Sequence, residues 1–109
     1  MTEYQHKSLA AGRWLELTLA DQMLNIGSEV SRANRWRVKG NEDQCHKAAD
    51  RALELLSLTI DCQLGKHAIG ELCRLYEVMA DFYYGDNEYL TDSESLQKYF
   101  DVFLTSRTY

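Results

Sequence analysis

Carboxylates spaced one helical turn apart are the first feature of this sequence that could do chemistry. Glu77 and Asp81 lie four residues apart in a segment with helical periodicity, and Glu29 could face them from a neighbouring helix. Carboxylate oxygens are the ligands that Mg²⁺ prefers in proteins. Glu29, Glu77 and Asp81 are therefore a candidate Mg²⁺-binding set.

This carboxylate set is similar to that of the all-helical nucleoside triphosphate pyrophosphatases, which hold Mg²⁺ between two acidic pairs on adjacent helices. The resemblance implies an Mg²⁺-dependent nucleotide pyrophosphohydrolase. The chain departs from the family pattern of E-x-x-E with E-x-x-D, because Glu77 and Asp81 have three residues between them and the earlier helix offers only Glu29 with Asn25. No CxxC or HExxH motif occurs, and the sequence indicates no cofactor.

Two tryptophans share a second candidate surface with polar residues. A helix from Arg13 to Val38 would place in one sector of its wheel Trp14, Asn25, Glu29, Arg32 and Trp36. Tryptophan and arginine are enriched at protein interfaces, whereas a solvated face normally carries lysine and glutamate. We expect this face to bind a protein partner or a second copy of the chain. Binding of a second copy would make the protein a homodimer. The alternative is that a shorter helix covers part of the sector and one tryptophan belongs to the peripheral core.

A basic cluster at the end of the same helix raises the question of RNA binding. It contains Trp36 among Arg32, Arg35, Arg37 and Lys39. An exposed aromatic side chain can stack on a base while arginines hold phosphates. Cations also suit a helix C-terminus, and these four point around the wheel. The net charge of -5 further argues against a general nucleic-acid binder.

A loop rich in aromatic and polar residues follows the third predicted helix. Tyr84, Asp86, Asn87 and Tyr89 could line a small-ligand site, because loops often carry function. The favoured interpretation is that they seal one end of the bundle.

The cysteines and histidines show no catalytic or metal-binding spacing. Cys45 and Cys62 fall on the apolar face of the second predicted helix, where thiols in a reducing compartment act as small hydrophobic side chains. His6, His46 and His67 have no nucleophile partner at a recognisable spacing, and we interpret them as solvated.

The composition and periodicity predict helices throughout. Apolar residues make up 45% of the 109 residues, and there is no proline. Apolar stripes at helical spacing predict helices over 13–38, 41–62, 68–84 and 91–105. Gly40 with Asn41 predicts the first turn, and Thr91 with Glu94 predicts a capping box for the last helix.

These elements predict an all-α fold, an antiparallel up-down-up-down four-helix bundle. We expect one domain over residues 1–109, with residues 1–7 as a disordered N-terminal arm. No apolar run approaches the roughly 18 residues that span a bilayer, and the first residues have no signal-peptide core. We therefore expect a cytoplasmic protein that does not contact membranes.

Five segments of the chain resemble a set of small, uncharacterised prokaryotic four-helix-bundle proteins: GRW, NIGSEVSRANRW, RALELLSLTI, DFYYGDNEY and LQKYF. The resemblance implies a prokaryotic cytoplasmic protein and no known activity. The long helix with a tryptophan near its start, followed by an Ala/Leu-rich helix, is also remotely similar to HEPN-type bundles. The catalytic pattern of that family is an arginine, four to six residues and a histidine. No arginine precedes a histidine at that distance here, so only a binding role is implied.

Overall fold

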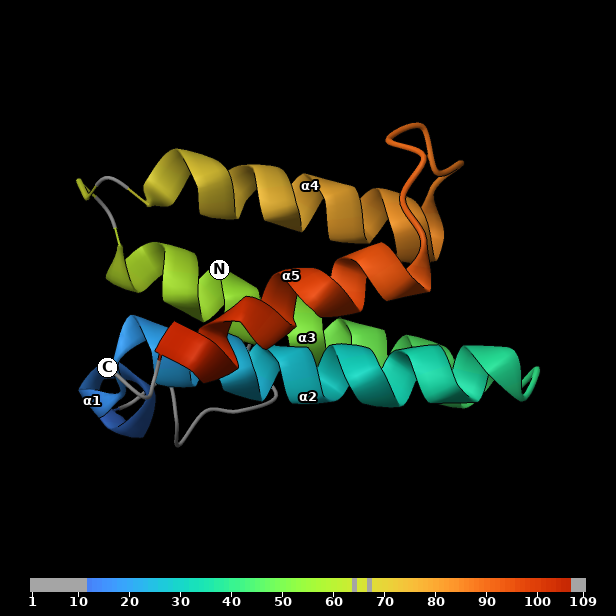
Figure 1. Cartoon of the computed structure of the whole chain (residues 1–109), viewed down its shortest axis with the longest axis horizontal. Helices are drawn as coiled ribbons and strands as arrows, with labels where there is room; N and C mark the ends of the chain where they lie inside the picture. The colour runs from blue at the N-terminus through green and yellow to red at the C-terminus, as the bar shows by residue number, and fades with distance from the viewer. Residues whose placement is uncertain (1–11, 64, 67, 107–109) are drawn as a thin grey trace.

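Helices make up all the regular secondary structure of the described residues. The computed structural model describes residues 12–63, 65–66 and 68–106, and only the backbone of 103–106. The helices are α1 (Trp14–Glu16), α2 (Leu19–Val38), α3 (Glu42–Cys62), α4 (Ile69–Tyr84) and α5 (Ser93–Ser106) (Figure 1). The expected all-α bundle is confirmed. The arm predicted at residues 1–7, and the predictions for His6 and His67, lie outside the described residues.

The single helix predicted for residues 13–38 is instead two helices. The backbone is extended at Leu17 and Thr18, with ψ angles of 146° and 160°. The Thr18 hydroxyl accepts a hydrogen bond from the Asp21 backbone N–H at 3.1 Å and caps α2. The prediction was wrong because a threonine that favours a cap over a helix interior stands within a run of helical periodicity.

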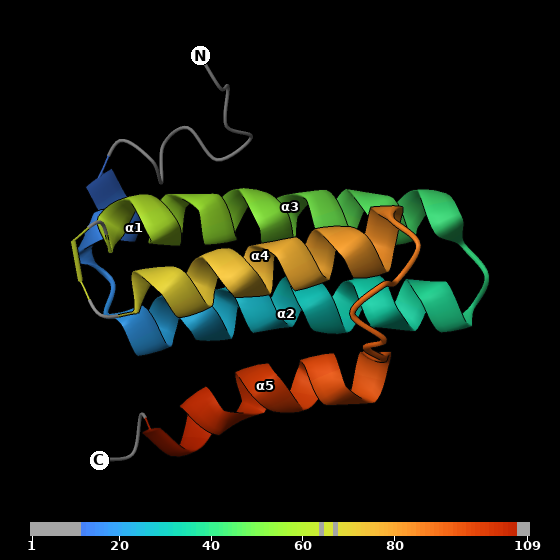
Figure 2. The ribbon, with the colours of Figure 1, turned by 90° about the horizontal axis from the view of Figure 1, so that it is seen from above.

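The turns between the long helices form where glycine and asparagine predict them. Gly40, after α2, and Gly65, after α3, both have the left-handed backbone, with φ of +77° and +80°. The Asn41 side chain accepts a hydrogen bond from the Gln44 backbone N–H at 3.1 Å and caps α3. Successive long helices, α2 to α5, consequently run in alternating directions (Figures 1 and 2).

The last helix begins one residue later than its predicted capping box implies. Asp92 is the cap, because its Oδ1 accepts a hydrogen bond from the Ser95 backbone N–H at 2.7 Å. The Thr91 backbone N–H instead donates to the Asn87 side chain at 3.0 Å. The loop before α5 therefore takes Thr91 away from the capping role.

Packing is centred on α2 and α3. The α2 helix contacts both α3 and α5, while α4 packs on α3 (Figure 2). All five helices contribute apolar side chains to one core, and its most enclosed large members are Met23, Ile26, Leu56, Met79 and Phe100. None of the described helices is long and apolar enough to cross a bilayer.

Candidate functional site

The first tryptophan of the predicted partner surface lies in the core. Trp14 is 2% exposed, and its Nε1 donates a hydrogen bond to the Thr59 hydroxyl of α3 at 3.1 Å. The Gln22 side-chain amide donates to the Trp14 carbonyl oxygen at 2.8 Å. The expectation that Trp14 shares an outer face with Trp36 is therefore wrong. The break at Thr18 turns α1 away from the axis of α2 and lets the indole pack inward.

The other members of that predicted surface make contacts within the subunit. The Glu29 carboxylate accepts hydrogen bonds from Arg51 of α3 and from Arg32, the latter at 2.8 Å. Trp36 is half-buried against the core, and the Lys39 ammonium lies 5.2 Å from its ring centroid. Asn25 is exposed, and its amide donates to the Asp21 carbonyl oxygen at 2.8 Å. A partner-binding role for Asn25, Glu29, Arg32 and Trp36 stays a prediction.

The three candidate metal carboxylates are held by separate partners. Asp81 accepts hydrogen bonds from the backbone N–H groups of Glu88 and Tyr89, both at 3.0 Å. Glu77 accepts one from the Tyr89 hydroxyl at 3.1 Å, whereas Glu29 is bound to its arginines. Within the described part of the chain, no group of three His, Cys, Asp or Glu side chains is placed to hold a metal ion. The fold does not bring this set together.

The loop between α4 and α5 is braced by its own polar groups. The Asn87 side chain bonds both the N–H and the carbonyl of Thr91, at 3.0 and 2.9 Å. The Tyr84 hydroxyl donates to Asp50 of α3 and lies 3.1 Å from the His46 carbonyl oxygen. Tyr84, Asn87 and Tyr89 thus tie the loop and the end of α4 in place. Tyr84 and Tyr89 are nevertheless about half exposed and Asp86 is exposed, so sealing of the bundle end stays a prediction.

One residue of this loop combines a strained backbone with exposure. Leu90 has a φ of +53° and is 87% exposed. An L-residue with a side chain pays roughly 1–2 kcal/mol for the left-handed conformation. Asn87 has the same φ, which asparagine tolerates well. The leucine is therefore the unusual residue.

An apolar groove runs between the end of α2 and the start of α5. Its volume is about 390 Å³, and it is lined by Ser31, Asn34, Arg35, Val38, Lys39, Ser93, Glu94 and Gln97. We call it the α2–α5 groove. Val38 at its edge is 85% exposed.

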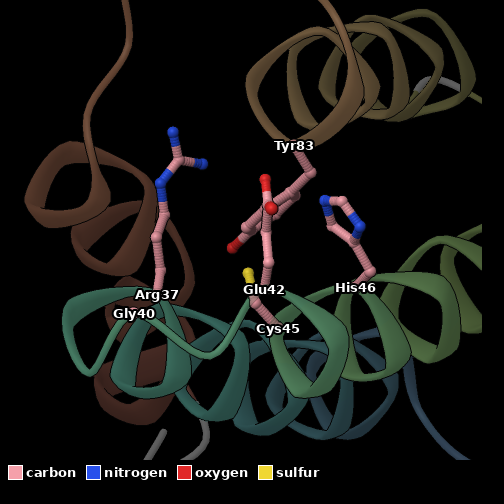
Figure 3. A pocket seen from close by; sticks show the side chains of 6 residues that line it. All are labelled: Arg37, Gly40, Glu42, Cys45, His46 and Tyr83. Atoms are coloured by element: carbon pink, nitrogen blue, oxygen red, sulfur yellow. The ribbon is translucent and has the colours of Figure 1, made fainter.

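A polar cavity of about 290 Å³ lies at the turn between α2 and α3, and its lining side chains come from three helices. We call it the end pocket, lined by Arg37, Gly40, Glu42, Cys45, His46 and Tyr83 (Figure 3). The Glu42 carboxylate stands between the Arg37 guanidinium on one side and the His46 imidazole on the other. Cys45 and Tyr83 lie beneath them and are buried.

The two buried side chains of the end pocket are held in their neutral forms. Burial raises the pKa of the Cys45 thiol, and the Glu42 carboxylate raises it further, whereas Arg37 lowers it. Burial also raises the pKa of Tyr83, whose hydroxyl donates to the Asn34 side-chain oxygen at 2.7 Å. A neutral thiol is a poor nucleophile. The Cys45 thiol is therefore not activated as a nucleophile.

The basic cluster does not converge on one site. Arg32 pairs with Glu29, Lys39 lies over Trp36, and Arg35 lines the α2–α5 groove. The Arg37 guanidinium stacks on the Phe82 ring, with its Cζ 4.3 Å from the ring centroid. Arg35 and Lys39 therefore share the α2–α5 groove, while Arg32 and Arg37 face other parts of the surface.

The sequence interpretation missed the end pocket because its residues looked unremarkable one by one. His46 was interpreted as solvated, Cys45 and Tyr83 as core, and Arg37 as a helix-terminal cation. Glu42, Cys45 and His46 do share one helical side at i, i+3 and i+4, which was the available signal. Comparisons with protein-family models, with curated proteins and with solved structures found no match to this chain.

Proposed function

We propose that this chain is a non-catalytic protein-interaction module that forms a homodimer. The observation that carries the proposal is Leu90, which keeps a left-handed backbone and an 87% exposed side chain. Both features cost free energy in an isolated subunit. The hydrogen bonds of Asn87 and Asp81 nevertheless hold the loop in this form. Burial of Leu90 in a partner offsets that cost.

The α2–α5 groove is the surface that Leu90 of a second copy would enter. It is large enough for an aliphatic side chain, and Val38 at its edge adds a second exposed apolar group. The groove contains the first turn of α5, so it lies at the same end of the bundle as the loop (Figure 1). A two-fold axis at this end would pair loop with groove twice.

The charges of the two surfaces are complementary. The loop carries three exposed carboxylates, Asp86, Glu88 and Asp92. The groove is lined by the exposed cations Arg35 and Lys39 and by one exposed carboxylate, Glu94, which pairs with Lys98. Opposite potentials speed association and select the register of the contact. A surface that carries both signs next to an apolar knob and groove is suited to pairing with itself.

A cytoplasmic location is part of this proposal. Cys45, Cys62 and Cys73 are all free thiols, and Cys73 is exposed. Exposed free thiols are best preserved in a reducing compartment.

Leu90→Gly tests the proposal directly. Glycine adopts the left-handed backbone without strain. The free energy of unfolding of the variant should therefore equal or exceed that of the wild type. We expect its dimer dissociation constant to rise by about tenfold or more, because the apolar anchor is lost. Sedimentation equilibrium measures association, and urea unfolding measures stability.

The control is Leu15→Ser, which removes an exposed leucine from α1. Leu15 is 64% exposed and belongs to the opposite end of the molecule, so dimerisation should be unchanged (Figure 1). A wild-type chain that stays monomeric at about 1 mM would overturn the homodimer. So would an equal loss of association in both variants.

A further inference from the structure

The end pocket has the size and lining of a small-molecule site, independently of any dimer. Its volume of about 290 Å³ is close to the lower end of the range for such sites, roughly 300 Å³. The last turn of α2, the first turn of α3 and the last turn of α4 supply the lining (Figure 3). Gly40 has no heavy atom within 4 Å of where a Cβ would be, so the mouth stays open at the turn.

Arg37 is fixed in place before any ligand arrives. Its guanidinium stacks on the Phe82 ring, and its Nη1 donates to the Phe82 carbonyl oxygen at 3.2 Å. This contact uses one of the five N–H donors of a guanidinium. A fixed guanidinium loses little entropy on binding, and its planar fork matches carboxylate and phosphate oxygens.

His46 is also held in place, on the far side of the pocket. Its ring lies 4.6 Å from the ring of Tyr84, centroid to centroid, with 35° between the planes. The Tyr84 hydroxyl lies 3.1 Å from the His46 carbonyl oxygen and also donates to Asp50. The imidazole can therefore donate a hydrogen bond across the cavity toward a group bound by Arg37.

Glu42 adds a requirement that a simple anion does not meet. Its carboxylate points into the space between Arg37 and His46 (Figure 3). An ionised carboxylate only accepts hydrogen bonds, and it repels a bare anion. A fitting ligand must offer a hydroxyl or amino group to Glu42 and an oxyanion to Arg37.

We propose that the end pocket binds a small oxyanion that also carries a hydrogen-bond donor. Arg37 and His46 hold the carboxylate or phosphate group, and Glu42 accepts the hydroxyl or amino group. Cys45 and Tyr83 are the buried members of the lining that such a ligand would contact.

Amide NMR titration of the full chain with four probes tests this assignment. Glycerol phosphate should bind more tightly than inorganic sulfate, and glycine more tightly than acetate, by about tenfold, because only the first of each pair carries a hydrogen-bond donor for Glu42. If glycerol phosphate binds more tightly than glycine, the pocket is a phosphate site. If glycine binds more tightly, it is a carboxylate site. Shifts should saturate at Glu42, Cys45 and His46.

Two variants and one control separate this site from general charge effects. Arg37→Gln should weaken every probe by about tenfold or more, because it removes a charged hydrogen-bond donor. Glu42→Gln, at an exposed position, should raise the affinity for inorganic sulfate and shrink the advantage of glycerol phosphate. Arg32→Gln removes one charge from the same helix outside the pocket and should change affinity by less than twofold.

Some results would overturn the site. These are shifts that never saturate, an equal loss in Arg32→Gln and Arg37→Gln, or no gain for inorganic sulfate in Glu42→Gln. Should Arg37→Gln fail to fold, the Glu42→Gln arm still decides. A monomeric chain that binds the probes would leave this site standing while the proposed dimer fails.

Discussion

Tyrosine hydroxyls join the helices of this bundle at the scale of single residues. Each bonds a polar group on another helix, in the pairs Tyr83 with Asn34, Tyr84 with Asp50 and Tyr99 with Glu71. Burial is the main cause that raises the pKa of all three phenols, and the neighbouring carboxylates raise those of Tyr84 and Tyr99 further. The folded state therefore favours the neutral phenol at these positions.

Stability should consequently fall at alkaline pH. The pKa of Tyr99 rises from 10.0 to about 12 in the folded chain. Between these values the unfolded chain has lost a proton that the folded chain keeps. The free energy of unfolding therefore falls as pH rises. The stabilisation is complete below about pH 10 and is lost as pH passes 12.

Tyr99→Phe measures how much the Tyr99 phenol contributes to the fall of the unfolding free energy at alkaline pH. We expect its unfolding free energy to fall less steeply than that of the wild type between pH 10 and 12. Urea unfolding followed by circular dichroism at several pH values gives the slopes. Tyr76→Phe, at an exposed position on α4, should keep the wild-type slope. Equal slopes in wild type and Tyr99→Phe would contradict the assignment.

Trp14 shows why residue-scale environments were harder to predict than residue types. Its residue type predicted a contact with a partner molecule, but its side chain is buried and donates to Thr59 of the same chain. The helical wheel assumed one continuous axis from Arg13 to Val38. The extended backbone at Thr18 makes the helical-wheel positions of all earlier residues wrong. Hydrophobic periodicity alone does not reveal this break.

At the scale of elements, a glycine decides how closely α5 can approach α2. A Cβ on Gly27 would lie 2.8 Å from the Phe100 Cβ, which is too short for two carbon atoms. Gly27 therefore lets the two helices pack at close range. Helical periodicity does not indicate which residue of another helix packs against this glycine.

Gly27→Ala should destabilise the bundle although alanine is the better helix former. Overpacking costs about 1–3 kcal/mol, which exceeds the helix-propensity gain of about 1 kcal/mol. Gly70 in α4 is the matched control, because nothing lies within 4 Å of its added Cβ. Gly70→Ala should stabilise by about 0.5–1 kcal/mol. Urea unfolding measures both, and a stabilised Gly27→Ala would contradict the packing.

Helix boundaries were predicted correctly where they depend only on residues within a short segment. Gly40 and Asn41 terminate and start helices as expected, because caps depend on neighbours within four residues. Thr91 failed as a cap because Asn87 binds its N–H, and the loop that allows this contact depends on Asp81. The exposed left-handed Leu90 follows from the same loop and has no sequence signature.

At the scale of the whole molecule, the end pocket required coordinates. Arg37 and His46 are separated by a turn, and Tyr83 comes from a helix much further along the chain. Spacing rules act within one element, whereas this cavity depends on how α4 ends against α2 and α3 (Figure 3). The resemblances to prokaryotic bundles and to HEPN-type bundles stay predictions, since they rest on amphipathic segments that many helical proteins share.

The proposed dimer makes one prediction that only the intact molecule can answer. Arg35→Glu and Glu88→Arg each place like charges across the two-fold contact, so each should raise the dissociation constant by about tenfold or more. The double variant exchanges the two signs within one chain and should recover most of the wild-type affinity. Sedimentation equilibrium at low and high salt measures all four chains, and salt should shrink the differences between them. If the two losses simply add in the double variant, Arg35 and Glu88 do not face each other across the dimer contact.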